Sequence, residues 1–164
     1  MKICMIGSGY VGLVSGACFS DLGNTVNCVD NNKEIIDKLN RGIIPIYEPG
    51  LQELIETNKK KKRIFFSKDI SSSIKNSDIL FICVGTPTIN NKANLKYVYN
   101  VVKSIKSNLN KYKIIVTKST VPVTTGDKIE KLLTTKKNKK SFDIVSNPEF
   151  LREGEAIRDF SYPD

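Results

Sequence analysis

The sequence predicts an α/β fold built on a parallel sheet of about six strands, and three observations support this. Short apolar runs alternate with longer amphipathic segments, which is typical of strands buried on both faces and joined by helices. The glycine-rich turn Gly7-Ser8-Gly9-Tyr10-Val11-Gly12 follows the first apolar run. Asp30 ends the second run, 18 residues after Gly12. Together these features predict a Rossmann-type, doubly wound sheet with strand order 3-2-1-4-5-6.

Each strand is expected at a run rich in valine, isoleucine or phenylalanine. These runs cover residues 2–6, 25–30, 63–67, 78–84, 112–117 and 142–146. Helices are expected between them, at residues 11–22, 32–40, 49–58, 95–107 and 125–134. The alternation gives two βαβαβ halves, the arrangement of a dinucleotide-binding domain.

Three of the helices carry more specific signals. The buried face predicted for residues 95–107 consists of Leu95, Val98, Val102 and Ile105, which recur at helical spacing. In the helix at 125–134, Ile129 and Leu132 are expected to share one face in the same way. Pro49 suits the first turn of the helix at 49–58, where a proline removes no intrahelical hydrogen bond.

The glycine-rich turn has a separate physical reason for each glycine. Gly7 permits a tight turn out of the strand, Gly9 lets the backbone approach a pyrophosphate, and Gly12 allows close packing of the helix. The N-terminus of that helix presents free N–H groups, which attract negative charge. A structural turn without a ligand is the alternative, but the surrounding strand and helix favour dinucleotide binding.

Asp30 also bears on which dinucleotide is bound. Its carboxylate is placed to accept a hydrogen bond from a ribose hydroxyl, and it would repel a 2′-phosphate. Asn31 and Asn32 follow it where an arginine would favour NADP, although Lys33 leaves that choice partly open. We therefore predict NAD as the cofactor.

Other polar motifs follow later strands, so a parallel sheet places them at the same carboxyl edge, where ligands bind. They are Gly85-Thr86-Pro87, Lys118-Ser119-Thr120 and Asn147-Pro148-Glu149. Structural alternatives remain for each: a plain turn for the first, helix capping by Ser119 or Thr120 for the second, and acids that cap or charge the start of a helix for the third. Glu149 and Glu153 are four apart, which puts them on one helical face if that segment is helical.

Composition and charge limit the remaining possibilities. A chain of 164 residues is expected to form one domain, here 1–164. The net charge of +9 results from 22 lysines and only 4 arginines against 17 acidic residues, and the lysines cluster partly at 59–62 and 136–140. Solvated loops and helix ends explain these lysines better than nucleic-acid binding, for which arginine forks are typical. No apolar stretch approaches the ~20 residues that cross a bilayer, and no signal peptide is expected.

The cysteines are interpreted as small buried hydrophobic residues. Cys4, Cys18, Cys28 and Cys83 show no CxxC spacing, so neither a metal site nor a redox pair is predicted. Unpaired thiols suit a reducing cytoplasm. The chain has no histidine, so any proton transfer must use other side chains or water.

Five ordered motifs together resemble the UDP-glucose/GDP-mannose dehydrogenase family over essentially the whole chain. They are Gly7–Leu13, Tyr47-Glu48-Pro49-Gly50-Leu51, Val84–Pro87, Lys118-Ser119-Thr120-Val121-Pro122 and Asn147–Gly154. Within the family the tyrosine of the second motif and the KSTVP sequence of the fourth favour the UDP-glucose branch. The second motif looks like a helix entry, and its chemistry alone suggests no mechanistic role.

The resemblance implies oxidation of UDP-glucose to UDP-glucuronate with two NAD, through a cysteine thiolate. It also implies roles for individual residues. Thr120 and Glu149 match positions that place water and move protons, and are the catalytic candidates. NAD contacts are implied for Gly7, Ser8, Gly9, Tyr10, Val11, Gly12, Asp30, Thr86, Thr120 and Glu153. Substrate contacts are implied for Glu149, Phe150, Leu151, Arg152 and Glu153.

Departures from the family pattern matter as much. The family's nucleophilic cysteine, its UDP-binding domain and most of its oligomer contacts lie beyond residue 164, so the chain is expected to be an inactive N-terminal fragment of a homo-oligomer. Ile35 stands where relatives often carry a basic residue, and Thr124 where glycine is common. A stand-alone NAD-binding or sensor module, and a sister enzyme for GDP-mannose or a UDP-amino sugar, remain alternatives.

Overall fold

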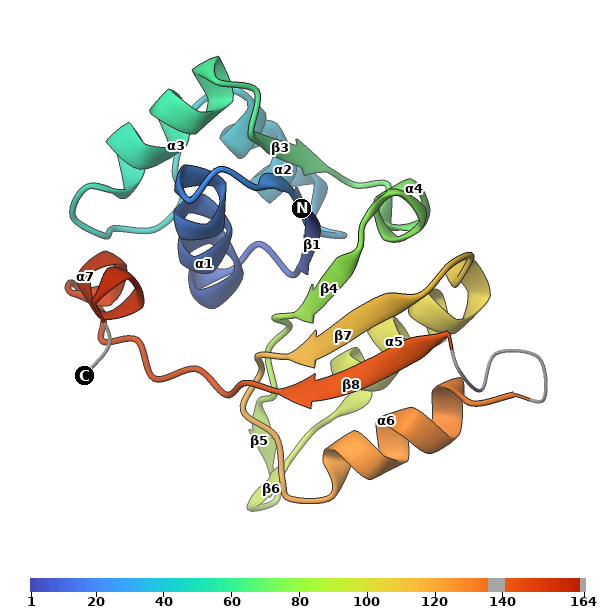
Figure 1. Ribbon diagram of the computed structural model, residues 1–164. Coiled ribbons are helices and arrows are strands. Elements are labelled where there is room, and N and C mark those ends of the chain that lie inside the picture. The colour runs from blue at the N-terminus through green and yellow to red at the C-terminus, as the bar shows by residue number, and fades with distance from the viewer. Residues whose placement is uncertain (136–140, 163–164) are drawn as a thin grey trace.

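The computed structural model describes residues 1–135 and 141–162, and in these residues six strands form one parallel sheet (Figure 1). The strands are β1 (Lys2–Ile6), β2 (Thr25–Val29), β3 (Ile64–Ser67), β4 (Ile79–Ile82), β7 (Lys113–Thr117) and β8 (Phe142–Ser146). Their spatial order is β3-β2-β1-β4-β7-β8. Because β7 and β8 are the fifth and sixth strands of this sheet, the predicted order 3-2-1-4-5-6 is confirmed.

Register brings the ends of the central strands level with one another. Ile6 at the end of β1 pairs with Val29 on one side and with Ile82 on the other. The turns that follow β1, β2 and β4 therefore emerge at one edge of the sheet, as expected for parallel strands. Cys83 and Val84, predicted as the last residues of a strand, lie just beyond the end of β4.

The helices cover both faces of the sheet. In the described residues they are α1 (Tyr10–Asp21), α2 (Lys33–Asn40), α3 (Leu51–Lys60), α4 (Ile70–Asn76), α5 (Lys96–Asn108), α6 (Thr125–Leu133) and α7 (Ala156–Ser161). Helices α1, α2 and α3 pack on one face, and α4, α5 and α6 on the other. Helix α7 lies beside α1 (Figure 1).

The faces predicted for two helices are tested by burial. In α5, Val98, Val102 and Ile105 are buried as expected, and Leu95 packs against them. In α6 the prediction is wrong for Leu132, which is 45% exposed, because Leu133 takes the buried position beside Ile129. The lysine cluster at 59–62 lies at the end of α3, largely in solvent, and the cluster at 136–140 lies outside the described residues.

Several elements differ from the sequence prediction. Helix α3 begins at Leu51, so Pro49 precedes the helix instead of occupying its first turn. Helix α4 was not expected, and Asp69 caps it by accepting a hydrogen bond from the Ser72 amide at 2.9 Å. A hairpin of β5 (Thr88–Ile89) and β6 (Lys92–Ala93) was also not expected.

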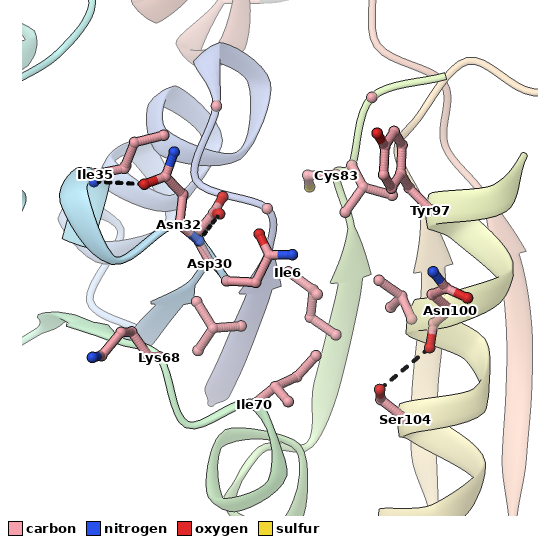
Figure 2. Close-up of a pocket in the computed structure, with 17 residues that line it drawn as sticks. Ile6, Asp30, Asn32, Ile35, Lys68, Ile70, Cys83, Tyr97, Asn100 and Ser104 are labelled. Carbon is pink, nitrogen blue, oxygen red and sulfur yellow. Dashed lines mark hydrogen bonds between the residues drawn. The ribbon is translucent and has the colours of Figure 1, made fainter. Parts of the chain in front are cut away.

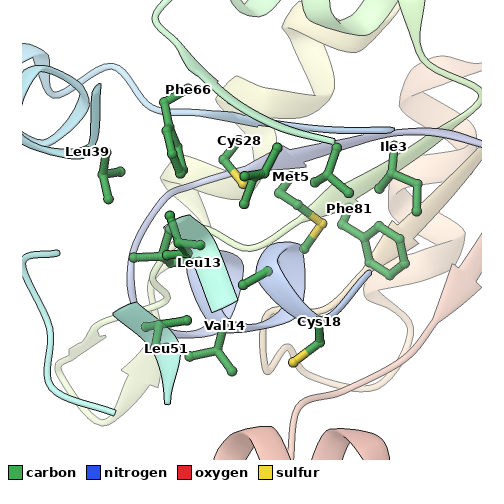
Figure 3. Close-up of a cluster of buried hydrophobic side chains, with 14 of the residues drawn as sticks. Ile3, Met5, Leu13, Val14, Cys18, Cys28, Leu39, Leu51, Phe66 and Phe81 are labelled. Carbon is green, nitrogen blue, oxygen red and sulfur yellow. The ribbon is translucent and has the colours of Figure 1, made fainter. Parts of the chain in front are cut away.

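Two hydrophobic clusters, one on each face, hold the layers together. Alternate residues of β1 contribute to them: Ile3 and Met5 to one, Cys4 and Ile6 to the other. Figure 3 shows the first cluster, in which side chains of the strands pack against α1. Among the described residues no helix is long and apolar enough to cross a membrane.

Candidate functional site

The glycine-rich turn lies at the carboxyl edge of the sheet, between β1 and α1. Gly7 adopts a φ of 108°, a left-handed conformation that favours glycine, and donates a hydrogen bond to the Val29 carbonyl at 2.8 Å. A Cβ on Gly12 would lie 1.8 Å from the Gly7 carbonyl oxygen. The predicted structural reasons for these two glycines are therefore confirmed, since one shapes the turn and the other lets α1 approach it.

Gly9 differs from its two neighbours in having no structural reason to be glycine. Its φ of −74° and ψ of −168° are available to any residue. A Cβ built on Gly9 would meet no protein atom within 4 Å. The backbone here faces open space at the start of α1, whose first amides have no carbonyl partner within the helix. This arrangement fits the close approach of an anionic ligand.

Two adjoining pockets lie at this edge of the sheet, and the larger of them begins at this turn and has a volume of about 620 Å³. Its walls come from residues at or just beyond the ends of β1, β2, β3 and β4 and from α5 (Figure 2). Asp30 and Asn32 line one side, and Tyr97, Asn100 and Ser104 of α5 line the other (Figure 2). The volume and the mixture of apolar and polar walls suit a small organic ligand.

Asp30 is held by two backbone hydrogen bonds inside this pocket. One carboxylate oxygen accepts from the Ser8 amide at 2.8 Å, and the other accepts from the Asn32 amide at 2.9 Å. Each oxygen keeps further acceptor capacity for a ligand hydroxyl. The Ser8 amide therefore donates to Asp30, and the buried Ser8 hydroxyl has no hydrogen-bond partner among the described residues.

A smaller pocket of about 280 Å³ adjoins the first on the far side of the turn. It brings together six residues predicted for the site, which are Gly9, Tyr10, Val11, Thr86, Thr120 and Glu149. The Thr86 hydroxyl donates to the Thr120 carbonyl at 2.9 Å, which joins the loops after β4 and β7.

Lys118 and Ser119 complete the wall of the smaller pocket. The Ser119 hydroxyl donates to the Val84 carbonyl at 2.6 Å, so it ties two loops together and does not cap a helix. Thr124 is the N-cap of α6, and it makes no side-chain capping bond. The capping alternative for Ser119 and Thr120 is therefore wrong.

The segment after β8 is a loop with turns, and this corrects the idea that Glu149 and Glu153 share a helical face. Helix α7 begins only at Ala156. The Glu149 carboxylate accepts a hydrogen bond from the Leu151 amide, and Gly154 adopts a φ of 90°. Residues 149–152 form no helix, and the positive φ of Gly154 is incompatible with a helix continuing into α7.

The substrate-binding candidates of this segment are largely directed away from the two pockets. Phe150 is 83% exposed, and neither Leu151 nor Glu153 lines either pocket. The Arg152 guanidinium forms a bidentate ion pair with Asp159, at 3.0 and 2.6 Å. That pairing lowers the pKa of the Asp159 carboxyl to about 2.

Sequence reasoning missed two groups of residues at the site. Lys68 and Ile70, which follow β3, line the larger pocket, as does the polar face of α5. The signal for the first was available, because Lys68 follows a strand just as the predicted motifs do. The spacing of Tyr97, Asn100 and Ser104 also places them on one helical face.

The second missed group centres on Glu48, which is buried with 6% of its surface exposed. Its carboxylate accepts hydrogen bonds from the Tyr10 hydroxyl at 2.5 Å, the Gly154 amide at 2.8 Å and the Ala156 amide at 2.9 Å. Burial by itself raises the pKa of Glu48, but these hydrogen bonds outweigh it, so the pKa lies below its ordinary value. Glu48 therefore remains ionised at neutral pH.

The cysteines are poor nucleophiles in this environment. Burial raises the pKa of Cys4, Cys18 and Cys83 to about 12, so each is a neutral thiol at pH 7. Lys118 lowers the pKa of Cys83, but the burial of the thiol dominates. In the described part of the chain no cluster of three or more potential ligands could hold a metal ion.

Sequence comparison finds strong similarity across the chain. The model for the NAD-binding domain of the UDP-glucose/GDP-mannose dehydrogenase family matches residues 1–164. UDP-glucose 6-dehydrogenase of Rhizobium meliloti is 49% identical, covering 100% of this chain and 38% of that protein. UDP-glucose 6-dehydrogenase TuaD of Bacillus subtilis is 52% identical, covering 96% of this chain and 35% of that protein. The chain thus spans 35–38% of the length of these two relatives.

Solved structures agree with the sequence comparison. A UDP-glucose dehydrogenase from Pyrobaculum islandicum superposes with a TM-score of 0.93 at 34% identity, over 99% of this chain and 39% of that one. A GDP-mannose dehydrogenase from Pseudomonas aeruginosa gives a TM-score of 0.92 at 35% identity, over the same shares. The fold is therefore shared by enzymes that act on different nucleotide sugars.

Proposed function

The chain belongs to the UDP-glucose/GDP-mannose dehydrogenase family, and we propose that it is the NAD-binding domain of a longer UDP-glucose 6-dehydrogenase. In this proposal residues 1–164 are an N-terminal domain, and a further part of the polypeptide binds UDP-glucose. The identity of 49–52% to UDP-glucose 6-dehydrogenases supports that substrate over GDP-mannose or a UDP-amino sugar.

The single observation that carries coenzyme binding is the open space at Gly9. Neither backbone conformation nor packing requires glycine there, whereas a pyrophosphate lying on the start of α1 would. The amides of Tyr10 and Val11 would bind the phosphates. The larger pocket would take the adenosine half, with Asp30 accepting from a ribose hydroxyl.

The preference for NAD over NADP follows from charge at the same place. The Asp30 carboxylate would lie against the 2′ position and repel a phosphate. Lys68 and Lys33 bring positive charge to this side of the domain, but only Lys68 lines the pocket. Replacing Asp30 is therefore the direct test of coenzyme choice.

The smaller pocket would hold the nicotinamide end of the coenzyme. Bound NAD supplies the hydride acceptor for oxidation of the substrate. Thr120 and Glu149 both line it, which supports their roles in placing water and moving protons. Thr86 would hold the Thr120 loop in place through its hydrogen bond. The thiol nucleophile must come from outside this chain, because Cys4, Cys18, Cys28 and Cys83 show no suitable site.

The positions of Phe150 to Glu153 suggest how the segment would meet the substrate. Phe150 and Glu153 are exposed, so they are available to the nucleotide sugar or to the remaining part of the polypeptide. Arg152 is already paired with Asp159, which would fix the shape of this loop. The complete enzyme is proposed to be a homo-oligomer, and its free cysteines suit the reducing cytoplasm.

The decisive experiment uses the complete polypeptide that carries this domain. We expect NADH to form, measured by absorbance, with UDP-glucose and NAD and not with GDP-mannose. The chain of residues 1–164 alone should bind NAD in a calorimetric titration but form no NADH. If the chain binds NAD and the complete polypeptide oxidises no nucleotide sugar, the sensor-module alternative is favoured instead.

A further inference from the structure

The motif Tyr47-Glu48-Pro49-Gly50-Leu51 has no role in the function proposed above, yet its geometry is specific. The Leu51 amide donates to the Glu48 carbonyl at 3.1 Å, which closes a β-turn. Gly50 has a φ of 78° and a ψ of −10°, values of the third residue of a type II turn, and Pro49 occupies the favoured second position. Buried Leu51 then anchors the start of α3. The turn thus holds the Glu48 side chain in a fixed direction.

The carboxylate of Glu48 joins two segments that are far apart in sequence. One is the start of α1, through the Tyr10 hydroxyl. The other is the loop before α7, through the amides of Gly154 and Ala156, 106 and 108 residues away. Among the described residues, no side chain other than Glu48 accepts a hydrogen bond from those two amides.

Each segment carries residues proposed for the reaction. Tyr10 follows Gly9 directly and lines the smaller pocket together with Glu149. Gly154 follows Glu153 directly, so the Glu48 contact lies at the C-terminal end of the loop that begins at Glu149. The distance between the glycine-rich turn and this loop is therefore set through one carboxylate.

Hydrophobic contacts hold α7 independently of this carboxylate. The Phe160 ring meets the Phe19 ring edge to face, with centroids 5.0 Å apart. Ile157 also packs in the same cluster. Loss of the Glu48 contact should therefore disturb the loop without detaching the helix.

From these contacts we infer that Glu48 is a positioning residue, which sets the 149–154 loop over the nicotinamide end of the coenzyme by joining Gly154 and Ala156 to Tyr10. The expected effect on turnover rests on the proposed function, whereas the Glu48 contact is present without any coenzyme. Glu48 touches neither pocket and acts only through its partners.

The informative variant is Glu48→Gln, which keeps the size of the side chain. An amide accepts hydrogen bonds at only one of its two ends. Whichever way the amide turns, either Gly154 or Ala156 faces a second donor and loses its acceptor. A buried amide without an acceptor is strongly disfavoured, so the loop should leave its position.

A matched control is available at the opposite end of the same two helices. Asn58, fully buried in α3, donates to the Asp21 carboxylate of α1 at 3.2 Å. Asn58→Ala removes a part-buried contact between α3 and α1 far from either pocket. It should lower the melting temperature of the domain but leave the turnover of folded enzyme unchanged.

Two measurements test the inference. Hydrogen exchange on the chain without coenzyme should show the amides of Gly154 and Ala156 exchanging at least tenfold faster in Glu48→Gln and unchanged in Asn58→Ala. In the complete polypeptide, kcat at saturating NAD and UDP-glucose should fall about tenfold in Glu48→Gln and stay unchanged in Asn58→Ala. A tenfold fall is about the effect of losing one buried hydrogen bond.

The outcomes separate the two proposals. If the wild-type polypeptide neither binds NAD nor turns over, the proposed function fails, while the exchange measurement still tests the contact. If the wild type is active and Glu48→Gln has the same kcat per folded molecule, or the same exchange rates, Glu48 is not a positioning residue.

Discussion

Adding one methyl group at Gly9 is expected to weaken coenzyme binding at least about a hundredfold while leaving the fold intact. The backbone at Gly9 already has an ordinary conformation, and the new Cβ would meet no protein atom within 4 Å. Alanine is a poorer N-cap than glycine by up to about 1 kcal/mol. It also restricts the unfolded chain, which stabilises by about 0.4–1 kcal/mol. The free energy of unfolding of Gly9→Ala should thus stay within about 1 kcal/mol of the wild type.

The effect on binding should be much larger. The methyl group would occupy the space through which the pyrophosphate reaches the first amides of α1. Loss of two hydrogen bonds to a charged group, at about 1.5–3 kcal/mol each, amounts to roughly 3–6 kcal/mol. That corresponds to at least about a hundredfold rise in the Kd for NAD.

Calorimetric titration with NAD and urea unfolding measure the two quantities on the same samples. Gly12→Ala is the contrasting variant, because its Cβ would lie 1.8 Å from the Gly7 carbonyl oxygen. It should destabilise the fold itself by about 3 kcal/mol or more. Normal NAD affinity in a folded Gly9→Ala variant would refute the reasoning about the open space at Gly9.

Four other predictions follow. Asp30→Ala should weaken NAD binding by about 1–3 kcal/mol in calorimetry, with exposed Asp127→Ala as a charge-matched control; unchanged affinity would contradict the ribose assignment. Thr124 has a φ of 71°, a left-handed conformation that costs a residue with a Cβ about 1–2 kcal/mol. Glycine avoids this cost, although its greater freedom in the unfolded chain offsets about 0.5–1 kcal/mol of the gain. Thr124→Gly should therefore raise the urea midpoint, and a lower midpoint would disprove this. Because their pKa values are raised, the four cysteines should resist Ellman's reagent at pH 7 until the chain unfolds; rapid labelling of the native chain would contradict it. The pKa of Asp159 is lowered from 3.8 to about 2, so its stabilising ion pair with Arg152 is complete above pH 3.8 and lost as the pH falls through 2. In an NMR titration, the pKa of Asp159 should be higher in Arg152→Ala than in the wild type. An unchanged pKa would exclude the pairing.

The sheet and the glycine-rich turn were predictable from sequence because each depends on local patterns. Continuous apolar runs identify strands buried on both faces, and the order of the strands follows from the rules of parallel connections. Gly7 and Gly12 carry the geometric reasons expected of them. The edge at which the polar motifs meet was predictable too, because all parallel strands end there.

Elements held by distant contacts were not predictable in the same way. Helix α7 has only six residues; it packs on Phe19, and Glu48 holds the loop before it, both from distant parts of the chain. The two glutamates in the preceding loop matched helical spacing, but residues 149–152 form no helix and the positive φ of Gly154 separates them from α7. The β5–β6 hairpin had a local signal in the sequence, the consecutive residues Asn90 and Asn91. Asparagine tolerates the positive φ of a tight turn, and both residues adopt it here.

A crystal structure of the chain with NAD tests the central claim most directly. The account predicts the diphosphate against the amides of Tyr10 and Val11, the adenosine ribose beside Asp30, and the nicotinamide next to Thr120 and Glu149. A coenzyme found away from the carboxyl edge of the sheet, or with its diphosphate away from Gly9, would contradict it.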